Sequence, residues 1–188
     1  TYDFGETVLT TISVNNLSII GESMDKTIIR NAPDKSTESI DKTATLLNTS
    51  KNLYMQDLTI QNDLDYYAIG GTGRAVAFQD KGENTILKNV KMLSYQDTYY
   101  SHNTNNTYFE DCEVHGCVDY LCGDGNVIYN RCKFVNESRT KDKESGSDIL
   151  CAPSTSDACK WGYVFLDCNV SSNCTDFTLA RAWSNAIA

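Results

Sequence analysis

A repeated pattern of short strands is the feature that most constrains the fold. Six segments share one rhythm of β-branched and aromatic residues around a polar or Cys-containing bend, and they begin near residues 16, 52, 84, 106, 126 and 162. Within each segment, apolar and polar residues alternate with the period of two that is typical of strands, and no long stretch shows helical periodicity. The chain is therefore predicted to be all-β.

The spacing of the segments predicts how the strands are arranged. The steps between segment starts are 36, 32, 22, 20 and 36 residues. A coil of about 20 to 22 residues, with loops inserted into some turns, accounts for all five steps, and repeats of this length predict a parallel β-helix in which each coil stacks on the last. A β-sandwich is the alternative, but the chain lacks the Asn-Gly dipeptides that its hairpins would favour.

Bulk composition restricts the partners. A chain of 188 residues with 40% hydrophobic and 22% charged residues is expected to form one globular domain over residues 1–188. The net charge of −9 argues against nucleic acid and anionic membranes. No apolar run approaches the roughly 18 residues of a membrane helix, and the sequence given contains no signal peptide, as is also expected of a trimmed precursor. Eight cysteines favour an exported protein, secreted to the cell exterior.

Three cysteines occupy the same place in successive repeats: Cys112, Cys132 and Cys168. Parallel neighbours lie about 4.8 Å apart, which is within the Cα separation of a disulfide. A bridge between Cys112 and Cys132 is therefore predicted. The alternative is a ladder of free, buried thiols that pack as small hydrophobes.

Metal and cofactor sites have little support. The chain has no C-x-x-C, and His102 and His115 are its only histidines. Neither of the glycine-rich phosphate-binding motifs occurs. We therefore expect no metal and no cofactor, and we expect both histidines to be surface or structural residues.

Coil arithmetic predicts one column of reactive side chains. Arg74, Asp97 and Asp119 are separated by 23 and 22 residues, so each should lie one coil above the last, with Gln96 beside Asp97. Two carboxylates on adjacent coils repel, so the pKa of one rises and it can act as an acid while the other stays ionised. The alternative is a solvated polar face without chemistry.

Three motifs resemble the pectin methylesterase family of carbohydrate esterases. They are "SYQDTYYS" (94–101), "VDYLCG" (118–123) and "LARAW" (179–183), in the family's order and at its approximate separations. The resemblance covers about residues 21–183. It implies a right-handed parallel β-helix and hydrolysis of the methyl esters of homogalacturonan to polygalacturonate and methanol. Family domains are longer than this chain, so the resemblance also implies a β-helix truncated at one or both ends.

The resemblance also implies roles for individual residues. Asp119 matches the nucleophile that attacks the ester carbonyl, and Asp97 matches the general acid that protonates methanol and then activates water. Gln96 matches an amide that stabilises the oxyanion, and Arg181 matches the guanidinium that orients the nucleophile. The implied partner is methyl-esterified pectin, bound by a monomer.

Aromatic positions and departures complete the comparison with the family. Trp183 and Tyr120 match aromatic positions beside the sugar-binding groove. Arg74 stands where the family usually has a second glutamine; it can donate to an oxyanion, or pair with Asp97 instead. Gln79 is a poor substitute for that glutamine because its offset from Arg74 is odd. The "VDYLCG" segment has Leu-Cys where the family more often has Ile-Phe.

Three other functions remain open from the sequence. A catalytically impaired pectin-binding module would keep the groove without the chemistry, and Arg74 and "LARAW" favour it. A β-helical polysaccharide lyase or hydrolase would need a dense acidic cluster for calcium, which is absent around Asp97 and Asp119. A β-helical adhesin is the structural alternative.

Overall fold

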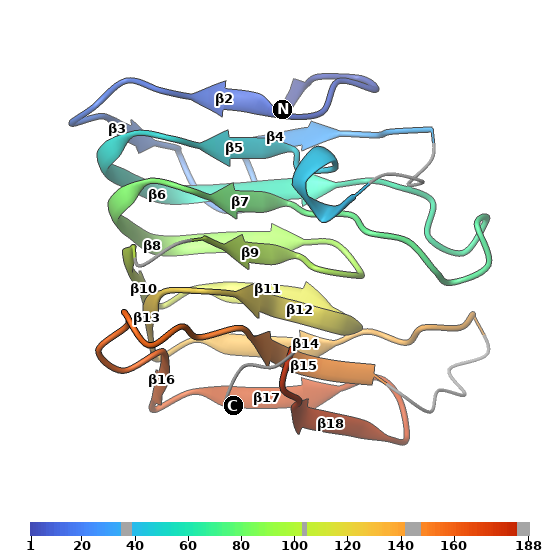
Figure 1. Ribbon diagram of the computed structural model, residues 1–188. Helices are drawn as coiled ribbons and strands as arrows, with labels where there is room; N and C mark the ends of the chain where they lie inside the picture. Colours follow the sequence, from blue (N-terminus) through green and yellow to red (C-terminus); the bar gives the residue numbers. More distant parts are fainter. Residues whose placement is uncertain (35–38, 103–104, 142–147, 184–188) are drawn as a thin grey trace.

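The chain winds into a right-handed parallel β-helix in the computed structural model, which describes residues 1–34, 39–102, 105–141 and 148–183 (Figure 1). The coils stack from the N-terminal end at the top of Figure 1 to the C-terminal end at the bottom. The described strands form two sheets, which we call sheet A and sheet B, and every strand pairs in parallel with strands of neighbouring coils. The predicted all-β parallel β-helix is confirmed.

The strand bounds are as follows. Sheet A contains β1 (Tyr2–Asp3), β3 (Ser18–Ile20), β4 (Ile28–Asn31), β6 (Lys51–Asn62), β8 (Glu83–Leu93), β10 (Asn106–Glu110), β11 (Glu113–Gly116), β13 (Asn126–Asn130), β14 (Lys133–Asn136), β16 (Tyr163–Leu166) and β17 (Asn169–Ser172). Sheet B contains β2 (Thr10–Ile12), β5 (Leu46–Asn48), β7 (Phe78–Asp80), β9 (Tyr99–Ser101), β12 (Val118–Gly123), β15 (Asp148–Pro153) and β18 (Phe177–Ala180). A 3-10 turn, η1 (Ile40–Lys42), precedes β5.

The strand register confirms the predicted spacing. In sheet A, the paired residues are Ser18 with Tyr54, Leu53 with Thr85, Thr85 with Thr107, Asn106 with Asn126, and Val127 with Tyr163. These pairs are separated by the same 36, 32, 22, 20 and 36 residues that the repeats predict. The repeated segments are thus the sheet A part of each coil, and sheet B supplies a third strand that the repeat pattern did not reveal.

Left-handed residues make the bend within sheet A in each coil from β6 onward. Within sheet A, a row of residues with φ between 51° and 55° separates the two halves of each coil; we call it the sheet A bend, and it comprises Asp57, Asn89, Asp111, Arg131 and Asp167. Asp and Asn tolerate this conformation better than most residues. The polar residue that precedes each repeated cysteine therefore has a backbone function.

A ladder of asparagines marks the turn from sheet B into sheet A. The Nδ2 of Asn52 donates to Oδ1 of Asn16 at 2.8 Å, Asn84 donates to Asn52 at 3.1 Å, and Asn106 donates to Asn84 at 3.4 Å. We call these four residues the asparagine ladder. Stacking identical amides at the strand spacing satisfies one donor and one acceptor per coil, which fixes the coils in register.

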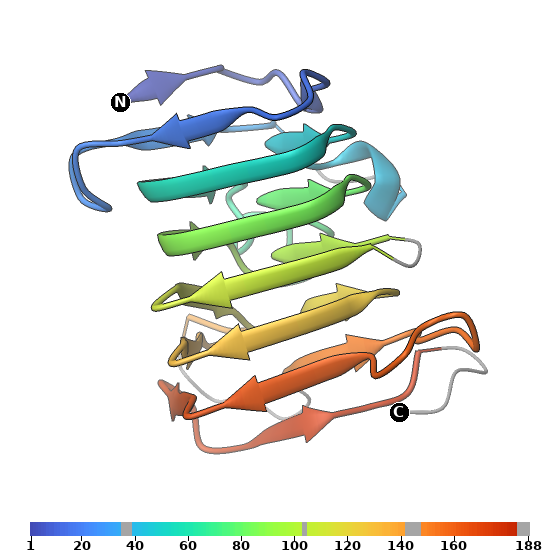
Figure 2. The same cartoon turned by 90° about the vertical axis from the view of Figure 1, so that its left-hand side faces the viewer.

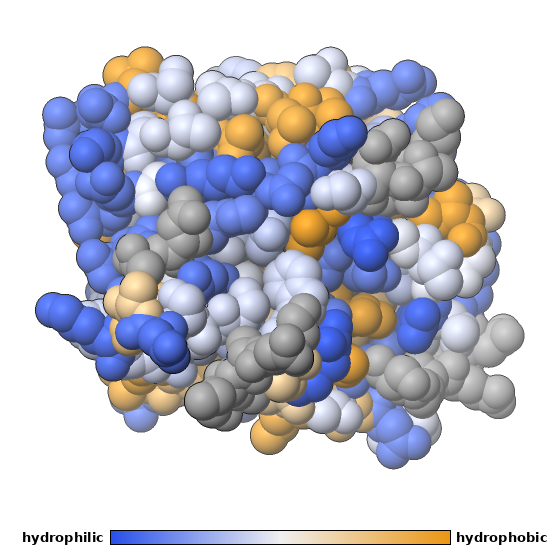
Figure 3. Space-filling model, in the orientation of Figure 1, coloured by the Kyte–Doolittle hydropathy of each residue, from blue (hydrophilic) through white to orange (hydrophobic). Residues whose placement is uncertain are grey.

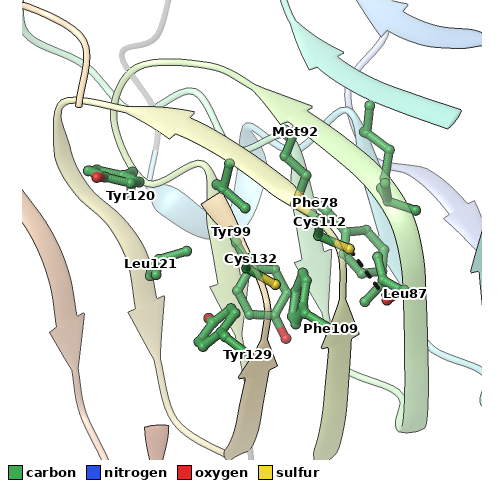
Figure 4. Packing of buried hydrophobic residues seen from close by; sticks show 14 of the residues in the cluster. Phe78, Leu87, Met92, Tyr99, Phe109, Cys112, Tyr120, Leu121, Tyr129 and Cys132 are labelled. Atoms are coloured by element: carbon green, nitrogen blue, oxygen red, sulfur yellow. Dashed lines mark hydrogen bonds between the residues drawn. The ribbon is translucent and has the colours of Figure 1, made fainter. Parts of the chain in front are cut away.

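Aromatic side chains fill the interior in a continuous stack. The ring centroids of Tyr99 and Phe109 are 4.8 Å apart, and Phe109 is 4.8 Å from Tyr129. Figure 4 shows these rings beside the cysteines, and all three residues are fully buried. Burial of large apolar side chains along the axis is the main stabilising contribution in such a solenoid.

The predicted disulfide between Cys112 and Cys132 is wrong, because all eight cysteines are free thiols. Each repeated thiol instead has its own backbone acceptor. The Sγ of Cys112 donates to the Leu87 carbonyl at 3.4 Å, and Cys132 and Cys168 make similar bonds to carbonyl oxygens. The structure therefore contains the alternative, a ladder of free thiols that pack as small hydrophobes.

Most of the exposed large hydrophobic side chains of the described residues lie in the first and last coils: Tyr2, Val14, Ile20, Phe165, Leu166, Val170 and Leu179. Figure 3 shows hydrophobic side chains near its upper and lower edges, with others at mid-height on the right. In the last coil, Phe165, Leu166 and Val170 are at least 37% exposed. Phe165 and Val170 line an apolar hollow of about 450 Å³. Among the described residues, no helix has the length and apolarity needed to cross a membrane.

Two long segments lie outside the strands. Residues 65–73 form turns, and Tyr67 donates to the Ser138 carbonyl at 2.8 Å. The charged segment 137–148 is described only in part, since residues 142–147 lie outside the described residues.

Candidate active site

The predicted column of polar residues forms on the outer face of sheet B. Gln96 is paired with Val118, and the Asp97 N–H donates to the Val118 carbonyl at 3.0 Å. This pairing places Asp97 next to Asp119 on the adjacent coil. One coil earlier, the Ala75 N–H donates to the Gln96 carbonyl at 3.0 Å, so Arg74 begins the column.

Both aspartates have a strained backbone and little exposure. Asp97 has φ of 61° and Asp119 has φ of 51°, and their exposed fractions are 5% and 7%. A left-handed residue at the start of a strand interrupts the alternation of side chains, which turns both carboxylates to the outer face beside each other. Conformations of this kind are frequent at functional sites.

Arg181 holds the Asp119 carboxylate in a bidentate pair. Its Nε donates to Oδ1 of Asp119 at 2.9 Å, and its Nη2 donates to Oδ2. Arg181 follows β18, two coils beyond Asp119. The planar guanidinium matches the two carboxylate oxygens, so the pair both neutralises and orients Asp119.

Asp97 has the opposite electrostatic situation. Burial, and then the neighbouring charge of Asp119, raise the pKa of Asp97 to about 8, although Arg74, Arg181 and a hydrogen bond from Gln96 act in the other direction. Asp97 is thus protonated at neutral pH beside an aspartate that is paired with an arginine. Acid–base chemistry requires two neighbouring carboxyl groups with different environments, one that holds a proton and one that is paired with a cation.

Gln96 and Arg74 flank the two carboxyl groups. The Gly73 N–H donates to Oε1 of Gln96 at 3.3 Å, which leaves the Nε2 amide of Gln96 as a donor on the side of Asp97. Arg74 is exposed at the rim, and its charge lowers the pKa of Asp97. Two donors of different charge therefore border the site.

Aromatic residues form one wall of the site. Trp183 is partly buried, and its ring lies 5.8 Å from the ring of Tyr100. Tyr100 in turn contacts the His102 ring at 4.1 Å. Sequence reasoning predicted Trp183 here but missed Tyr100, although Tyr100 lies only three residues beyond Asp97 and would be recognised once strand β9 is placed.

The predicted groove position of Tyr120 is wrong. Its side chain is fully buried and belongs to the core. The left-handed backbone of Asp119 turns Tyr120 inward, where it lies against Gly116; a Cβ at Gly116 would come within 2.1 Å of the Tyr120 Cβ. Tyr120 therefore supports the backbone beneath Asp119 and cannot contact a sugar.

A buried thiol and a cluster of polar residues lie next to the site. The Cys122 thiol is buried, and its Sγ lies 3.9 Å from Oδ1 of Asp97. Gln79 is fully buried and donates to Asp41 at 2.7 Å, so it is not available as the missing amide. His102 packs in the same cluster, with Nε2 3.1 Å from Oδ1 of Asp41. No signal in the sequence indicated Asp41.

Metal-binding groups are absent from the part of the chain that the structure describes: no three His, Cys, Asp or Glu side chains converge there. His115 instead lies between two glutamates, with Nδ1 2.7 Å from Glu137 and Nε2 2.8 Å from Glu113. Burial disfavours its charged form, but these two hydrogen bonds outweigh burial and raise its pKa.

Comparisons with known proteins all find pectinesterases. The sequence profile described as Pectinesterase matches residues 2–184. Pectinesterase A of Dickeya dadantii (strain 3937) is 32% identical over 199 residues, which cover 92% of this chain and 54% of the relative. Putative pectinesterase 11 of Arabidopsis thaliana is 31% identical over 146 residues, with 78% and 38% covered.

Solved structures agree in fold. A pectin methylesterase in complex with hexasaccharide VII has a TM-score of 0.83 and 30% identity, and pectin methylesterase PemA from Erwinia chrysanthemi has a TM-score of 0.80 and 28% identity. Each match covers 95% of this chain and 59% of the solved one. The chain spans about half the length of its curated relatives, or less. On the match over residues 2–184 and the shared β-helix, the chain belongs to the pectinesterase family.

Proposed function

We propose that this chain carries the catalytic centre of a pectin methylesterase, which hydrolyses methyl esters of homogalacturonan to polygalacturonate and methanol. The observation that supports this most is the pairing of unlike aspartates: a buried Asp97 with a raised pKa lies beside Asp119, which Arg181 holds in a bidentate pair. Relatives named as pectinesterases, and a neighbour solved with a hexasaccharide, favour this chemistry over an unrelated use of two acids.

In the first half of the reaction, a carboxylate oxygen of Asp119 attacks the ester carbonyl carbon. The carbonyl oxygen becomes an oxyanion, which the Nε2 amide of Gln96 and the guanidinium of Arg74 stabilise. Such donors typically contribute about 3 to 4 kcal/mol, or 10²–10³ in rate. The tetrahedral intermediate then expels methanol, whose oxygen takes the proton of Asp97, and an acyl-enzyme anhydride remains on Asp119.

In the second half, Asp97 is a carboxylate and acts as a base. It takes a proton from water, and the hydroxide oxygen attacks the acyl carbon. The bond to Asp119 breaks, which releases the galacturonate carboxyl group and regenerates the Asp119 carboxylate with Asp97 protonated again. Arg181 keeps the nucleophile in place through both halves, so orientation supplies part of the reduction in the barrier.

The aromatic wall suits a sugar polymer. Trp183 offers apolar ring surface on which a pyranose can lie, next to the reacting groups, and the buried Tyr100 supports it from behind. We propose that the partner is methyl-esterified pectin, bound outside the cell by a monomer. The eight free thiols give no disulfide support for export, so the location follows from the substrate alone.

Methanol release from highly methylated pectin tests the proposal. The chain should release methanol, and Asp119→Asn should not, although its shape is almost unchanged. Asp111→Asn is the matched control, since Asp111 is also a left-handed aspartate but lies in the sheet A bend. Equal methanol from the chain and Asp119→Asn would exclude this mechanism, and retention on pectin without methanol would favour an impaired binding module.

A further inference from the structure

A second cleft lies around the corner from the catalytic groove, on the outer face of sheet A. Figure 2 looks onto this face, where β6, β8, β10, β13 and β16 are stacked, with the loop before β16 at the lower right. The cleft has a volume of about 230 Å³ and runs across the starts of β8, β10 and β13. None of the residues assigned to the reaction lines it.

One wall of the cleft is apolar and rigid. Trp161 is 49% exposed and Ile86 is 43% exposed, although both are large hydrophobic side chains. The backbone N–H groups of Lys160 and Trp161 both donate to Oδ1 of Asn126, at 2.8 and 3.2 Å, which ties the Trp161 loop to β13. An exposed indole held on a fixed loop is suited to contact, since little side-chain entropy is lost on binding.

The asparagine ladder breaks at this cleft. Asn106 continues the ladder by donating to Asn84 at 3.4 Å, and the next residue in register is Asn126. The next bond of the ladder would run from the Nδ2 of Asn126 to the Oδ1 of Asn106, but no such bond forms, while the Trp161 loop engages the Oδ1 of Asn126. Among the described residues, neither the Oδ1 of Asn106 nor the Nδ2 of Asn126 makes a hydrogen bond within the protein, and both residues line the cleft.

The chemistry of the lining identifies the class of ligand. An acceptor and a donor on adjacent coils match two neighbouring hydroxyl groups of a sugar, and the indole offers a surface for the apolar face of the ring. The lining contains no charged side chain, so an anionic galacturonate would lose hydration without gaining a cation. The volume lies below the range of about 300–1,000 Å³ usual for drug-sized ligands, which favours one sugar unit.

We propose that this cleft, formed by Trp161, Asn106 and Asn126, is a binding site for one neutral sugar unit of a polysaccharide, separate from the catalytic groove. Trp161 stacks on the sugar ring, while the amides of Asn106 and Asn126 bond to adjacent hydroxyl groups. The site would hold the protein on a neutral glycan while the groove takes a different chain. It does not depend on the proposed esterase activity.

Tryptophan fluorescence can test the site, because the sequence has only two tryptophans. In a Trp183→Phe background, Trp161 is the remaining one. Galactotetraose, arabinotetraose and xylotetraose are titrated separately, with a tetramer of galacturonate as the anionic probe. We expect saturable quenching by at least one neutral sugar and at least tenfold weaker binding of the galacturonate tetramer.

Asn126→Asp is the matched variant. Its carboxylate still accepts the N–H groups of Lys160 and Trp161, but the donor to the sugar is lost, so affinity should fall about tenfold. Circular dichroism checks that the fold is intact. Quenching by none of the three neutral sugars overturns the proposal, as does stronger binding of the galacturonate tetramer. Equal affinity in a folded Asn126→Asp variant also overturns it.

Discussion

Two rows of left-handed residues in this molecule have nearly the same backbone and opposite electrostatics. In the sheet A bend, Asp111 faces Arg131, with Nε 2.8 Å from Oδ1, and the hydrogen bond from Arg131 lowers the pKa of Asp111. In the groove, Asp97 has φ of 61° and its pKa is raised to about 8. The difference lies in burial and in the neighbouring charge, since Asp97 stacks on a second aspartate.

The comparison shows how a structural position becomes a reactive one. Asp57 is partly exposed and Asp111 is exposed, and their partners are an amide and a guanidinium. Their carboxylates stay ionised and simply fill a backbone position that few residues tolerate. Asp97 and Asp119 fill the same kind of position, but both are buried. The two acids lie side by side, and Arg181 pairs with Asp119 alone. Four predictions test this contrast, from the largest expected effect to the smallest.

Asp119→Asn should abolish methanol release. The variant keeps the size and the left-handed preference of the residue, but an amide cannot attack the ester, so kcat should fall by roughly 10⁴-fold or more. Initial rates of methanol release on methylated pectin measure this. A residual rate within tenfold of the unmodified chain would remove Asp119 from the role of nucleophile.

Asp97→Asn should make the protein more stable at alkaline pH while impairing catalysis. The folded pKa of Asp97, about 8, lies above the unfolded value near 3.9. The folded state therefore keeps a proton that the unfolded chain loses, and the stability contributed below about pH 4 disappears as the pH rises to about 8. Asparagine has no such dependence.

Urea denaturation of both proteins at pH 5 and pH 8 measures this effect. The variant's advantage in free energy of unfolding should grow between the two values, and methanol release should fall by about 10²–10⁴-fold. A stability difference that does not change with pH would mean that Asp97 is ionised in the folded protein.

Arg74→Gln should change the pH profile more than the rate. Because Arg74 lowers the pKa of Asp97, its removal should raise that pKa and move the alkaline limb of the rate profile to higher pH. Gln remains a donor to the oxyanion, so the rate at pH 7 should change by less than about tenfold. The profile of kcat/KM from pH 5 to 10 measures both effects. A limb that moves to lower pH would show that Arg74 does not act on Asp97.

Asp111→Asn should have the smallest effect. The pair with Arg131 is exposed, and such pairs contribute about 0.2–1 kcal/mol. Asparagine also tolerates the left-handed conformation, so the free energy of unfolding should fall by less than about 1 kcal/mol, and methanol release should not change. Thermal and urea denaturation check the first part. A large loss of activity would mean that the sheet A bend and the groove are coupled.

Much of the proposed catalytic column was predictable because, in a β-helix with coils of similar length, residues one coil length apart in sequence lie next to each other in space. Residues 22 or 23 apart lie one coil apart, so the sequence spacing alone predicted that Arg74, Asp97 and Asp119 are neighbours. Arg181 could not be found in this way, since 62 residues and inserted loops separate it from Asp119. Only the family motif indicated it.

The wrong predictions have local causes. Tyr120 was expected in the groove, but a left-handed backbone at Asp119 cancels the alternation that the expectation assumed. The disulfide was inferred from Cα spacing, whereas the Cys112 and Cys132 thiols contact each other without a covalent bond and each has a backbone carbonyl as acceptor. Neither backbone handedness at one residue nor a hydrogen-bond partner in another coil can be read from a periodic pattern.

Parallel pairing at Gln96 and Val118 has a consequence for how such a centre can change over time. The backbone spacing between the proposed acid and the proposed nucleophile is the distance between parallel strands, about 4.8 Å, which the pairing of Gln96 with Val118 fixes. Surface mutations can therefore alter the charge of the groove, its length and its preference among substrates without altering that backbone spacing. Conversely, one residue inserted between β9 and β12 that shifted this pairing would displace one aspartate from the other. Loops elsewhere in the chain can vary in length, whereas the number of residues between Asp97 and Asp119 must be kept for the two to remain neighbours.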